Sequence, residues 1–177
     1  LELDRVDPNS RELVLDTRDL QIDSVKTAPA GSDDFRTTRF VLDRRDARLG
    51  SALRIVMPRD AARVRIAYAT LPQASGLQWL QPSQTVGQRS PFLFSQAQAL
   101  HARSMAPLQD TPRIRATYTA TLRVPDGLVA VMAAEGDAAN RRGQATFRFR
   151  MPQPIPSYLL ALAVGDLDFR AIGPRTG

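Results

Sequence analysis

The chain contains no cysteine and only one histidine, His101, among its 177 residues. Without cysteine it cannot form disulfide bridges, iron–sulfur clusters or thiolate zinc sites. A lone histidine cannot build a histidine-rich zinc site, and no G-x-S-x-G turn, Walker loop or G-x-G-x-x-G fingerprint occurs in the sequence. We therefore expect His101 to be a surface or packing residue, and this chain alone to bind no metal and to lack a complete catalytic set.

Long apolar runs are also missing. The longest, Tyr158–Val164, is far shorter than the roughly 20 residues that a membrane-spanning helix needs, so we expect no membrane partner. The composition, with 43% hydrophobic and 24% charged residues, is typical of a folded globular domain. A chain of 177 residues is long enough to bury a core without disulfides or a structural metal.

Lysine is nearly absent, because Lys26 is the only one among 24 basic residues and the rest are arginine. The net charge of +6 raises the question of a nucleic-acid partner. Many arginines, however, recur at every second position, which is typical of the solvent face of a half-buried sheet, and aromatic residues amount to only 6%. We therefore expect no nucleic acid to bind. These arginines are Arg63 and Arg65; Arg113, Arg115 and Arg123; and Arg148 and Arg150.

Alternation of apolar and polar residues is what the sequence has in abundance. The clearest run is RIRATYTATLRV, Arg113–Val124, in which every second residue is apolar. We expect an all-β fold of twisted antiparallel sheets, arranged as a saddle-like β-sandwich with one short helical turn. No repeat or low-complexity linker divides residues 1–177, so we expect one domain. The other expected strands are Glu12–Asp16, Leu20–Val25, Arg36–Leu42, Ala52–Met57, Ala62–Thr70, Leu128–Ala133 and Gln144–Met151.

Two stretches depart from simple alternation. Ser95-Gln96-Ala97-Gln98 fits a capping box, with Ser95 as the N-cap and Gln98 at the third helical position, and predicts the start of a short helix. Ser157–Arg170 reads as a strand that is apolar on both faces in its first half, which indicates cover by a second sheet or by another domain.

The same region carries a resemblance to a known family. The segment GLQWLQPSQTVGQRSPFLFSQAQALHARSMAPLQDTPRIRATYTATLRVP, Gly76–Pro125, closely resembles the amino-terminal domain of the zinc aminopeptidases of the leukotriene A-4 hydrolase type. Its most specific pieces are Leu77–Leu80, Phe94–Ala99 and Gln109–Pro112. Downstream, Pro154–Thr176 is similar to the last strand of that domain and its exit into the catalytic domain.

The resemblance implies that residues 1–177 are the N-terminal β domain of a zinc-dependent aminopeptidase that releases N-terminal residues from peptides. In that family the zinc is held by an H-E-x-x-H helix in the catalytic domain, together with a G-x-M-E-N loop, and neither motif occurs in this chain. The expected cofactor is thus zinc in the full-length parent, and the expected partners are a peptide N-terminus and the protein's own catalytic domain. The family also implies a cytoplasmic location, while a periplasmic or secreted one stays open.

The resemblance further implies that Gln98 accepts a hydrogen bond from the substrate α-amino group, with Gln96 and Ala99 lining the same subsite. Glutamine rather than glutamate at this position points to the leukotriene A-4 hydrolase branch. An amide oxygen is a suitable acceptor for an ammonium group. Two alternatives remain at this stage: Gln98 acts only as a cap for the Ser95 backbone, or the chain is a stand-alone basic β-sandwich interaction module without catalysis.

Overall fold

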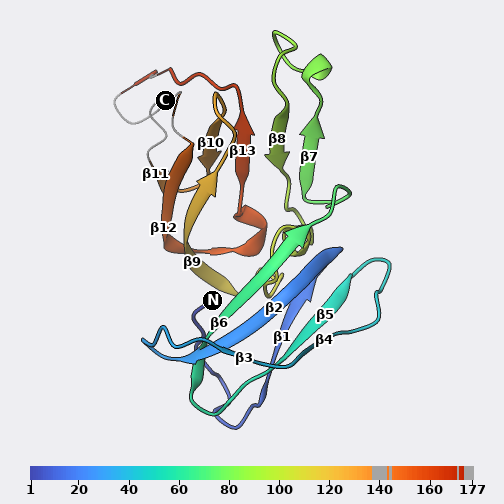
Figure 1. The fold of residues 1–177 in the computed structure, drawn as a ribbon, viewed down its shortest axis with the longest axis vertical. Coiled ribbons are helices and arrows are strands. Elements are labelled where there is room, and N and C mark those ends of the chain that lie inside the picture. The colour runs from blue at the N-terminus through green and yellow to red at the C-terminus, as the bar shows by residue number, and fades with distance from the viewer. Residues whose placement is uncertain (137–142, 144, 171, 174–177) are drawn as a thin grey trace. The chain divides into compact units, whose positions relative to one another are not determined.

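The computed structural model describes residues 1–136, 143, 145–170 and 172–173. Its regular elements are antiparallel β-strands and, in the described part, three short 3-10 turns (Figure 1). The all-β class that alternation predicted is therefore confirmed. Contacts divide the chain into two compact units: unit 1 comprises Leu1–Ala74 and Leu100–Asp110, and unit 2 comprises Ser75–Ala99 and Thr111–Gly177.

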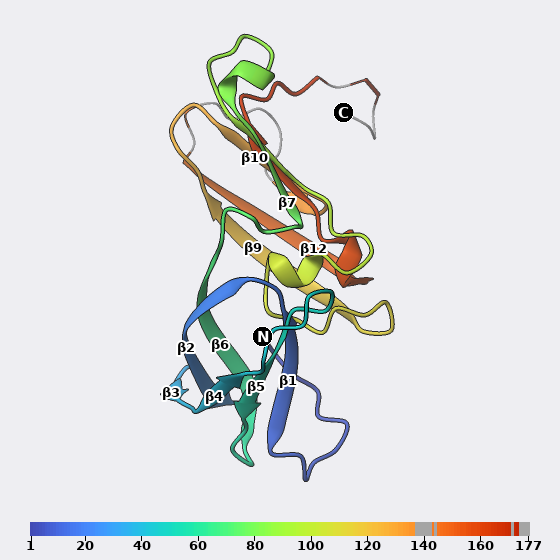
Figure 2. The ribbon, with the colours of Figure 1, turned by 90° about the vertical axis from the view of Figure 1, so that its right-hand side faces the viewer.

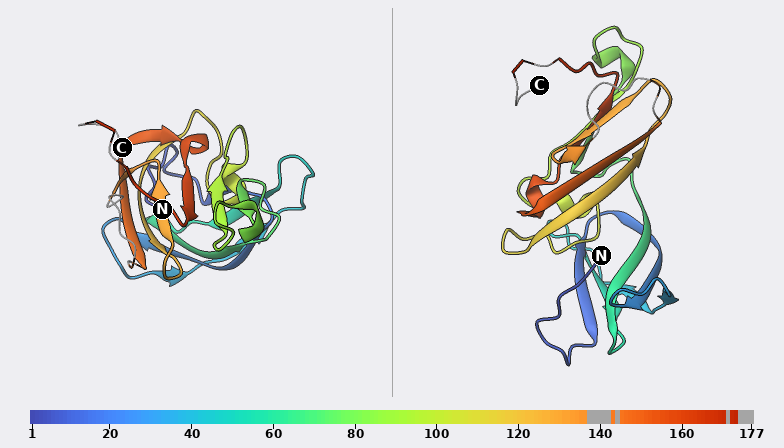
Figure 3. Two further views of the ribbon diagram at one scale, coloured as in Figure 1. Left: turned by 90° about the horizontal axis from the view of Figure 1, so that it is seen from above. Right: turned by 90° about the vertical axis from the view of Figure 1, so that its left-hand side faces the viewer.

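Unit 1 consists of two three-stranded sheets. One has the order β1-β5-β4 and the other the order β3-β2-β6. Leu15, Val25, Leu53, Ile55 and Val64 come from both sheets and form one buried cluster, so the two sheets pack face to face. Figures 2 and 3 show how β2 and β6 curve together. The strands are β1 (Glu12–Thr17), β2 (Leu20–Pro29), β3 (Arg36–Thr37), β4 (Phe40–Leu42), β5 (Ser51–Val56) and β6 (Ala61–Thr70), and the turn η2 (Ala102–Ser104) belongs to the same unit.

Unit 2 contains a four-stranded sheet of order β10-β13-β8-β7 and a three-stranded sheet of order β11-β12-β9. Val129 and Ala130 of the first sheet and Phe147 and Phe149 of the second share a buried cluster, which joins the two sheets. The elements are β7 (Leu77–Leu80), η1 (Pro82–Gln84), β8 (Phe92–Ser95), β9 (Arg115–Arg123), β10 (Val129–Met132), β11 (Glu135–Gly136), β12 (Thr146–Pro156), η3 (Ser157–Leu159) and β13 (Leu162–Gly165).

The period-two pattern of the sequence is realised in the long strands. Along β9 the arginine and threonine positions are exposed, while Tyr118, Ala120 and Leu122 are partly buried. On β12, Phe147 and Phe149 are buried and the arginines between and after them are exposed. The arginines at every second position of β9 and β12 thus lie on a solvent face, as expected, whereas the Arg63 side chain on β6 is only 24% exposed and pairs with Glu2 and Asp33. Gln144, where the last alternating strand was expected to begin, lies outside the described residues.

Several expectations were wrong in detail. The expected strand Arg36–Leu42 is two short strands, β3 and β4, that pair with different partners. The expected strand Ser157–Arg170 begins with the turn η3 and continues as the short strand β13, in which Leu162, Ala163 and Val164 are half-buried. Strands β7 and β8 were not expected, because neither LQWL nor FLFS alternates. Within the described ranges, no helix is long or apolar enough to cross a membrane.

Candidate functional site

The predicted substrate residues lie on the loop that follows β8 in unit 2. Strand β8 is an inner strand, since β7 pairs with one of its edges and β13 with the other. Its last residue, Ser95, faces Leu77 of β7, and its hydroxyl oxygen accepts a hydrogen bond from the Leu162 backbone N–H at 2.9 Å. The Gln96 N–H donates to the Gly76 carbonyl at 2.9 Å. The loop therefore starts from a backbone that is fixed on both sides.

This arrangement corrects the predicted capping box. Ser95 is a strand residue whose hydroxyl accepts from Leu162, so it does not cap a helix. The short helical turn of this stretch begins later, at Ala102, and His101 occupies its N-cap position. Gln98 makes no hydrogen bond to the Ser95 backbone among the described residues, so the structure gives no support to a capping role for its side chain.

The loop of residues 96–99 has polar side chains that are exposed to solvent and one residue that is buried. Ala97 is 2% exposed, whereas Gln96, Gln98 and Ala99 are exposed. The Gln98 backbone N–H donates to the Gln96 side-chain oxygen at 3.2 Å, so Gln96 stabilises the turn from within. The peptide bond between Gln98 and Ala99 is cis. Gln96 thus supports the turn, and Gln98 and Ala99 form its exposed tip.

The side-chain amide of Gln98 makes no hydrogen bond with another described residue. Its oxygen can accept from an ammonium or amide N–H, and its nitrogen can donate two hydrogen bonds. Because both groups already face solvent, a ligand can bind to them without breaking an internal contact of the described chain. The loop can therefore offer a hydrogen-bonding site for a polar group, while it contains no nucleophile or general base.

A second group of polar residues, which sequence reasoning missed, lies in unit 1. Arg103 and Asp110 are 4% and 3% exposed, and the Arg103 Nε donates to Asp110 Oδ2 at 3.0 Å. Arg103 Nη1 also donates to the Leu49 carbonyl at 2.8 Å and lies 3.3 Å from Asp16 Oδ1. Asp110 belongs to the Gln109–Pro112 piece of the family resemblance, so the motif could have indicated Asp110, but nothing local indicates Asp16 or Leu49.

His101 has the packing role that was expected of it. It is half-buried, its Nδ1 lies 3.2 Å from Arg18 Nη1, and its carbonyl oxygen accepts from the Ser104 hydroxyl at 2.8 Å. Nearby, the Tyr68 hydroxyl donates to the Met105 carbonyl at 3.1 Å, and burial raises the pKa of the Tyr68 phenol. In the described part of the chain, no group of three or more histidine, aspartate or glutamate residues is placed to hold a metal ion.

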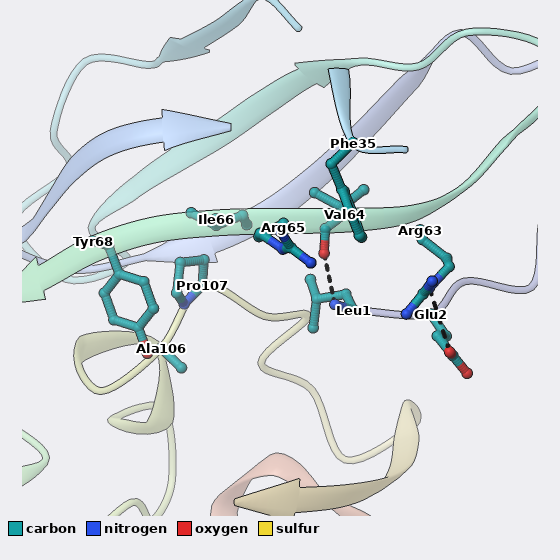
Figure 4. A pocket seen from close by; sticks show the side chains of 10 residues that line it. All are labelled: Leu1, Glu2, Phe35, Arg63, Val64, Arg65, Ile66, Tyr68, Ala106 and Pro107. Carbon is teal, nitrogen blue, oxygen red and sulfur yellow. Dashed lines mark hydrogen bonds and ion pairs between the residues drawn. The ribbon is translucent and has the colours of Figure 1, made fainter. Parts of the chain in front are cut away.

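A hollow of about 380 Å³ lies along β6 in unit 1 (Figure 4). Arg65 stacks over the Phe35 ring, with its guanidinium carbon 3.9 Å from the ring centre, and Arg63 pairs with Glu2 at 3.5 Å. The charges at this hollow are thus engaged within unit 1. None of the three predicted substrate residues lines it.

Comparison with known proteins connects these features to one family. Residues 4–159 match the Peptidase M1 N-terminal domain. The chain is 40% identical, over 99% of its length, to leucine aminopeptidase 2 of Pyricularia oryzae, of which it covers 29%. It superposes on native leukotriene A4 hydrolase from Saccharomyces cerevisiae with a TM-score of 0.82 and 35% identity, covering 98% of this chain and 26% of that one. The chain belongs to the M1 peptidase family and corresponds to its N-terminal domain.

A more distant structure shows the same fold. The M1 zinc metallopeptidase of Deinococcus radiodurans superposes with a TM-score of 0.65 at 23% identity, over 88% of this chain and 34% of that one. The chain spans 29% of the length of the leucine aminopeptidase and 26% of that of the yeast hydrolase. The family resemblance drawn from the sequence is confirmed.

Proposed function

We propose that this chain is the N-terminal β domain of a zinc-dependent aminopeptidase and that its loop at residues 96–99 forms part of the subsite for the substrate α-amino group. In this proposal Gln98 accepts a hydrogen bond from the α-ammonium, Ala99 lines the subsite, and Gln96 holds the turn. The protein's own catalytic domain carries the zinc, which activates water for attack on the first peptide bond. We include a cytoplasmic location in the proposal, because the family resemblance implies it.

The observation that carries the proposal is the state of the Gln98 side chain. It is exposed and makes no hydrogen bond with a described residue, on a loop whose backbone is tied by Gln96, Gly76 and Leu162. An exopeptidase has to distinguish a free N-terminus, and a tied loop backbone lowers the entropic cost of holding an acceptor against the ammonium.

The test is kinetic and uses the full-length enzyme. Gln98→Ala removes one hydrogen bond to a charged group, which is worth about 1.5–3 kcal/mol. We expect kcat/KM for an unblocked peptide to fall roughly ten- to hundredfold. Gln98→Glu keeps an acceptor and adds a negative charge, so it should restore most of that loss.

Gln73→Ala is the matched control, because Gln73 is also an exposed glutamine in a turn and makes no hydrogen bond with a described residue. It should leave kcat/KM unchanged. If Gln98→Ala behaves like Gln73→Ala, then Gln98 does not contact the substrate amine and the proposed role is wrong.

A further inference from the structure

Residues 1–3 extend the sheet of unit 1 along strand β6, on the side of β6 that faces away from β2. The Val64 N–H donates to the Leu1 carbonyl at 2.9 Å, and the Leu1 nitrogen donates to the Val64 carbonyl at 2.7 Å. The Leu3 N–H donates to the Ala62 carbonyl at 2.9 Å, and the pairing is antiparallel. This added ladder reaches Val64 and goes no further along β6 among the described residues.

Beyond Val64 the same edge of β6 is open. In an antiparallel ladder the backbone groups of successive residues point alternately to the two sides of the strand. Since the groups of Val64 point away from β2 and towards Leu1, those of Ile66, two residues further on, point the same way. There the Ile66 N–H and carbonyl make no hydrogen bond with a described residue. The edge therefore presents a backbone donor and acceptor that continue the ladder begun by Leu1.

The hollow along β6 lies at this open edge (Figure 4). Ile66 lines it, Leu1 bounds it at one end, and Tyr68 and Pro107 bound it at the other. Every residue that lines the hollow belongs to unit 1. Neighbouring strands lie about 4.8 Å apart, so a strand added to β6 in line with residues 1–3 would run through this space.

The charged side chains of β6 do not cover the open edge. Strand β6 is ten residues long and contains no proline, and its charged residues are Arg63 and Arg65. Their guanidinium carbons lie 5.3 and 3.9 Å from the centre of the Phe35 ring. Phe35 directly precedes β3, and β2 lies between β3 and β6, so the stack holds both side chains over the face of the sheet. A long edge strand without such protection pairs readily with another strand.

We propose that the edge of β6 from Arg65 to Thr70 binds an extended segment of the full-length protein, from outside residues 1–177, as an additional antiparallel strand in line with residues 1–3. The matching relatives are much longer than this chain, which spans 29% of leucine aminopeptidase 2, so a parent of that size has chain to supply the strand. The inference goes beyond the proposed function, because it does not depend on Gln98.

A segment of the same molecule is a better occupant of this edge than a second copy of the chain. A tethered segment has an effective concentration of roughly millimolar, which favours its binding over that of a separate molecule. Two copies of β6 paired edge to edge would also bring their arginines at positions 63 and 65 together, and like charges on neighbouring strands are destabilising.

The first experiment measures amide hydrogen exchange at single residues in the unmodified full-length protein. Val64 is the internal reference for a paired amide of this edge, because its N–H is bonded to Leu1. If a strand covers the edge, the Ile66 amide should exchange within about tenfold of the Val64 rate, since both are then ladder hydrogen bonds of one sheet. Exchange of Ile66 within about tenfold of the rate for an unstructured peptide would overturn the proposal.

Proline variants separate strand pairing from simple cover by side chains. Ile66→Ala and Ile66→Pro both shorten the side chain, but only proline removes the N–H. We expect full-length Ile66→Pro to melt at least about 5 °C below Ile66→Ala, because it loses a ladder hydrogen bond as well. Leu42→Pro and Leu42→Ala are the matched control pair, since Leu42 ends the edge strand β4 and the neighbouring Asp43 N–H bonds to Ala52. A proline penalty at Ile66 no larger than the one at Leu42 would contradict the proposal.

A cross-link identifies the segment that occupies the edge. Arg65 is exposed and lines the hollow, so p-azidophenylalanine in its place can react with a neighbouring strand when the full-length protein is illuminated. Peptide mapping should find a cross-link within one molecule, to a segment outside residues 1–177. Cross-links only to residues 1–177, or to a second copy of the chain, would overturn the proposal. The kinetics of the Gln98 variants test the proposed function separately, and their outcome leaves these measurements unaffected.

Discussion

The two units of the chain use arginine in different ways. In unit 1 five arginines pair with carboxylates, as Arg36 does with Asp34 at 2.8 Å and Arg103 with Asp110 at 3.0 Å. In unit 2, by contrast, the arginines along the outer face of β9 and β12 make no ion pair with any described residue. Those arginines are Arg115, Arg123, Arg148 and Arg150.

The two uses of arginine differ because Arg103 is buried, whereas the arginines on β9 and β12 are exposed. A guanidinium group in water needs no partner, so the exposed face of β9 and β12 can carry single arginines that keep the sheet solvated and its edge from pairing with other chains. Arg103 is 4% exposed and must be satisfied inside the protein. Ion pairs in unit 1 therefore connect segments of the chain, whereas the arginines on this face of unit 2 are exposed to solvent.

The largest effect should come from breaking the buried pair of unit 1. Asp110→Ala removes the buried carboxylate that accepts from Arg103 Nε and leaves only the partly exposed Asp16 beside the guanidinium group, which is expected to cost about 3–5 kcal/mol of unfolding free energy. Asp34→Ala breaks an exposed pair, with side chains 82% and 66% exposed, and should cost less than about 1 kcal/mol. Denaturant unfolding of the full-length protein measures both. Equal losses would show that burial does not set the value of these pairs.

A smaller effect should appear on acidification. Arg45 donates to Asp19 at 2.7 Å, and this hydrogen bond lowers the pKa of the Asp19 carboxyl below its ordinary value of 3.8. Because the folded-state pKa is the lower one, the pair stabilises the protein above about pH 4 and the stabilisation is lost as pH falls through the folded value. The Arg45 side chain is 53% exposed, so solvent screens the pair and its contribution to stability is small.

The variant Asp19→Asn tests this dependence. It should lose less thermal stability than the parent protein between pH 5 and pH 2, because it lacks the carboxylate that becomes protonated. Melting temperatures across that range, at constant ionic strength, give the comparison. Parallel curves for the two proteins would mean that the Arg45 contact does not contribute.

The smallest effect belongs to unit 2. Arg148→Gln removes an exposed side chain that has no ion pair with a described residue, so stability should change by less than about 0.5 kcal/mol. Added salt should not alter that difference, because no pair is screened. A clear loss of stability that salt abolishes would show that this face relies on its charges as unit 1 does.

The alternating strands could be predicted because a half-buried sheet imposes a period of two on its own sequence. Strands β6, β9 and β12 have long stretches of this kind, and the expected ranges overlap them closely. Strands β7 and β8 are only four residues long and have partly buried residues on both faces, so their sequences carry no such period. Resemblance to the family, rather than periodicity, directed the proposed substrate role to that region.

Other errors arose where tertiary contacts decide the local structure. Ser95 stands at a position where the sequence predicts an N-cap. Its hydroxyl oxygen instead accepts a hydrogen bond from the backbone N–H of Leu162, which is distant in the chain, and Ser95 remains the last residue of β8. The network of Arg103 depends on Asp16 and Leu49, which no local pattern connects with it. Contacts between distant parts of the chain override local preferences in both cases, and a single sequence does not report them.

The central claim is that Gln98 receives the substrate α-ammonium, and the most direct test measures that contact alone. The inhibition constants of an α-amino hydroxamate and of the same hydroxamate without its amine are compared in the full-length enzyme and in Gln98→Ala. We predict that Gln98→Ala weakens the amine-bearing inhibitor roughly ten- to hundredfold and leaves the other unchanged. Equal weakening of both inhibitors, or of neither, would contradict the account.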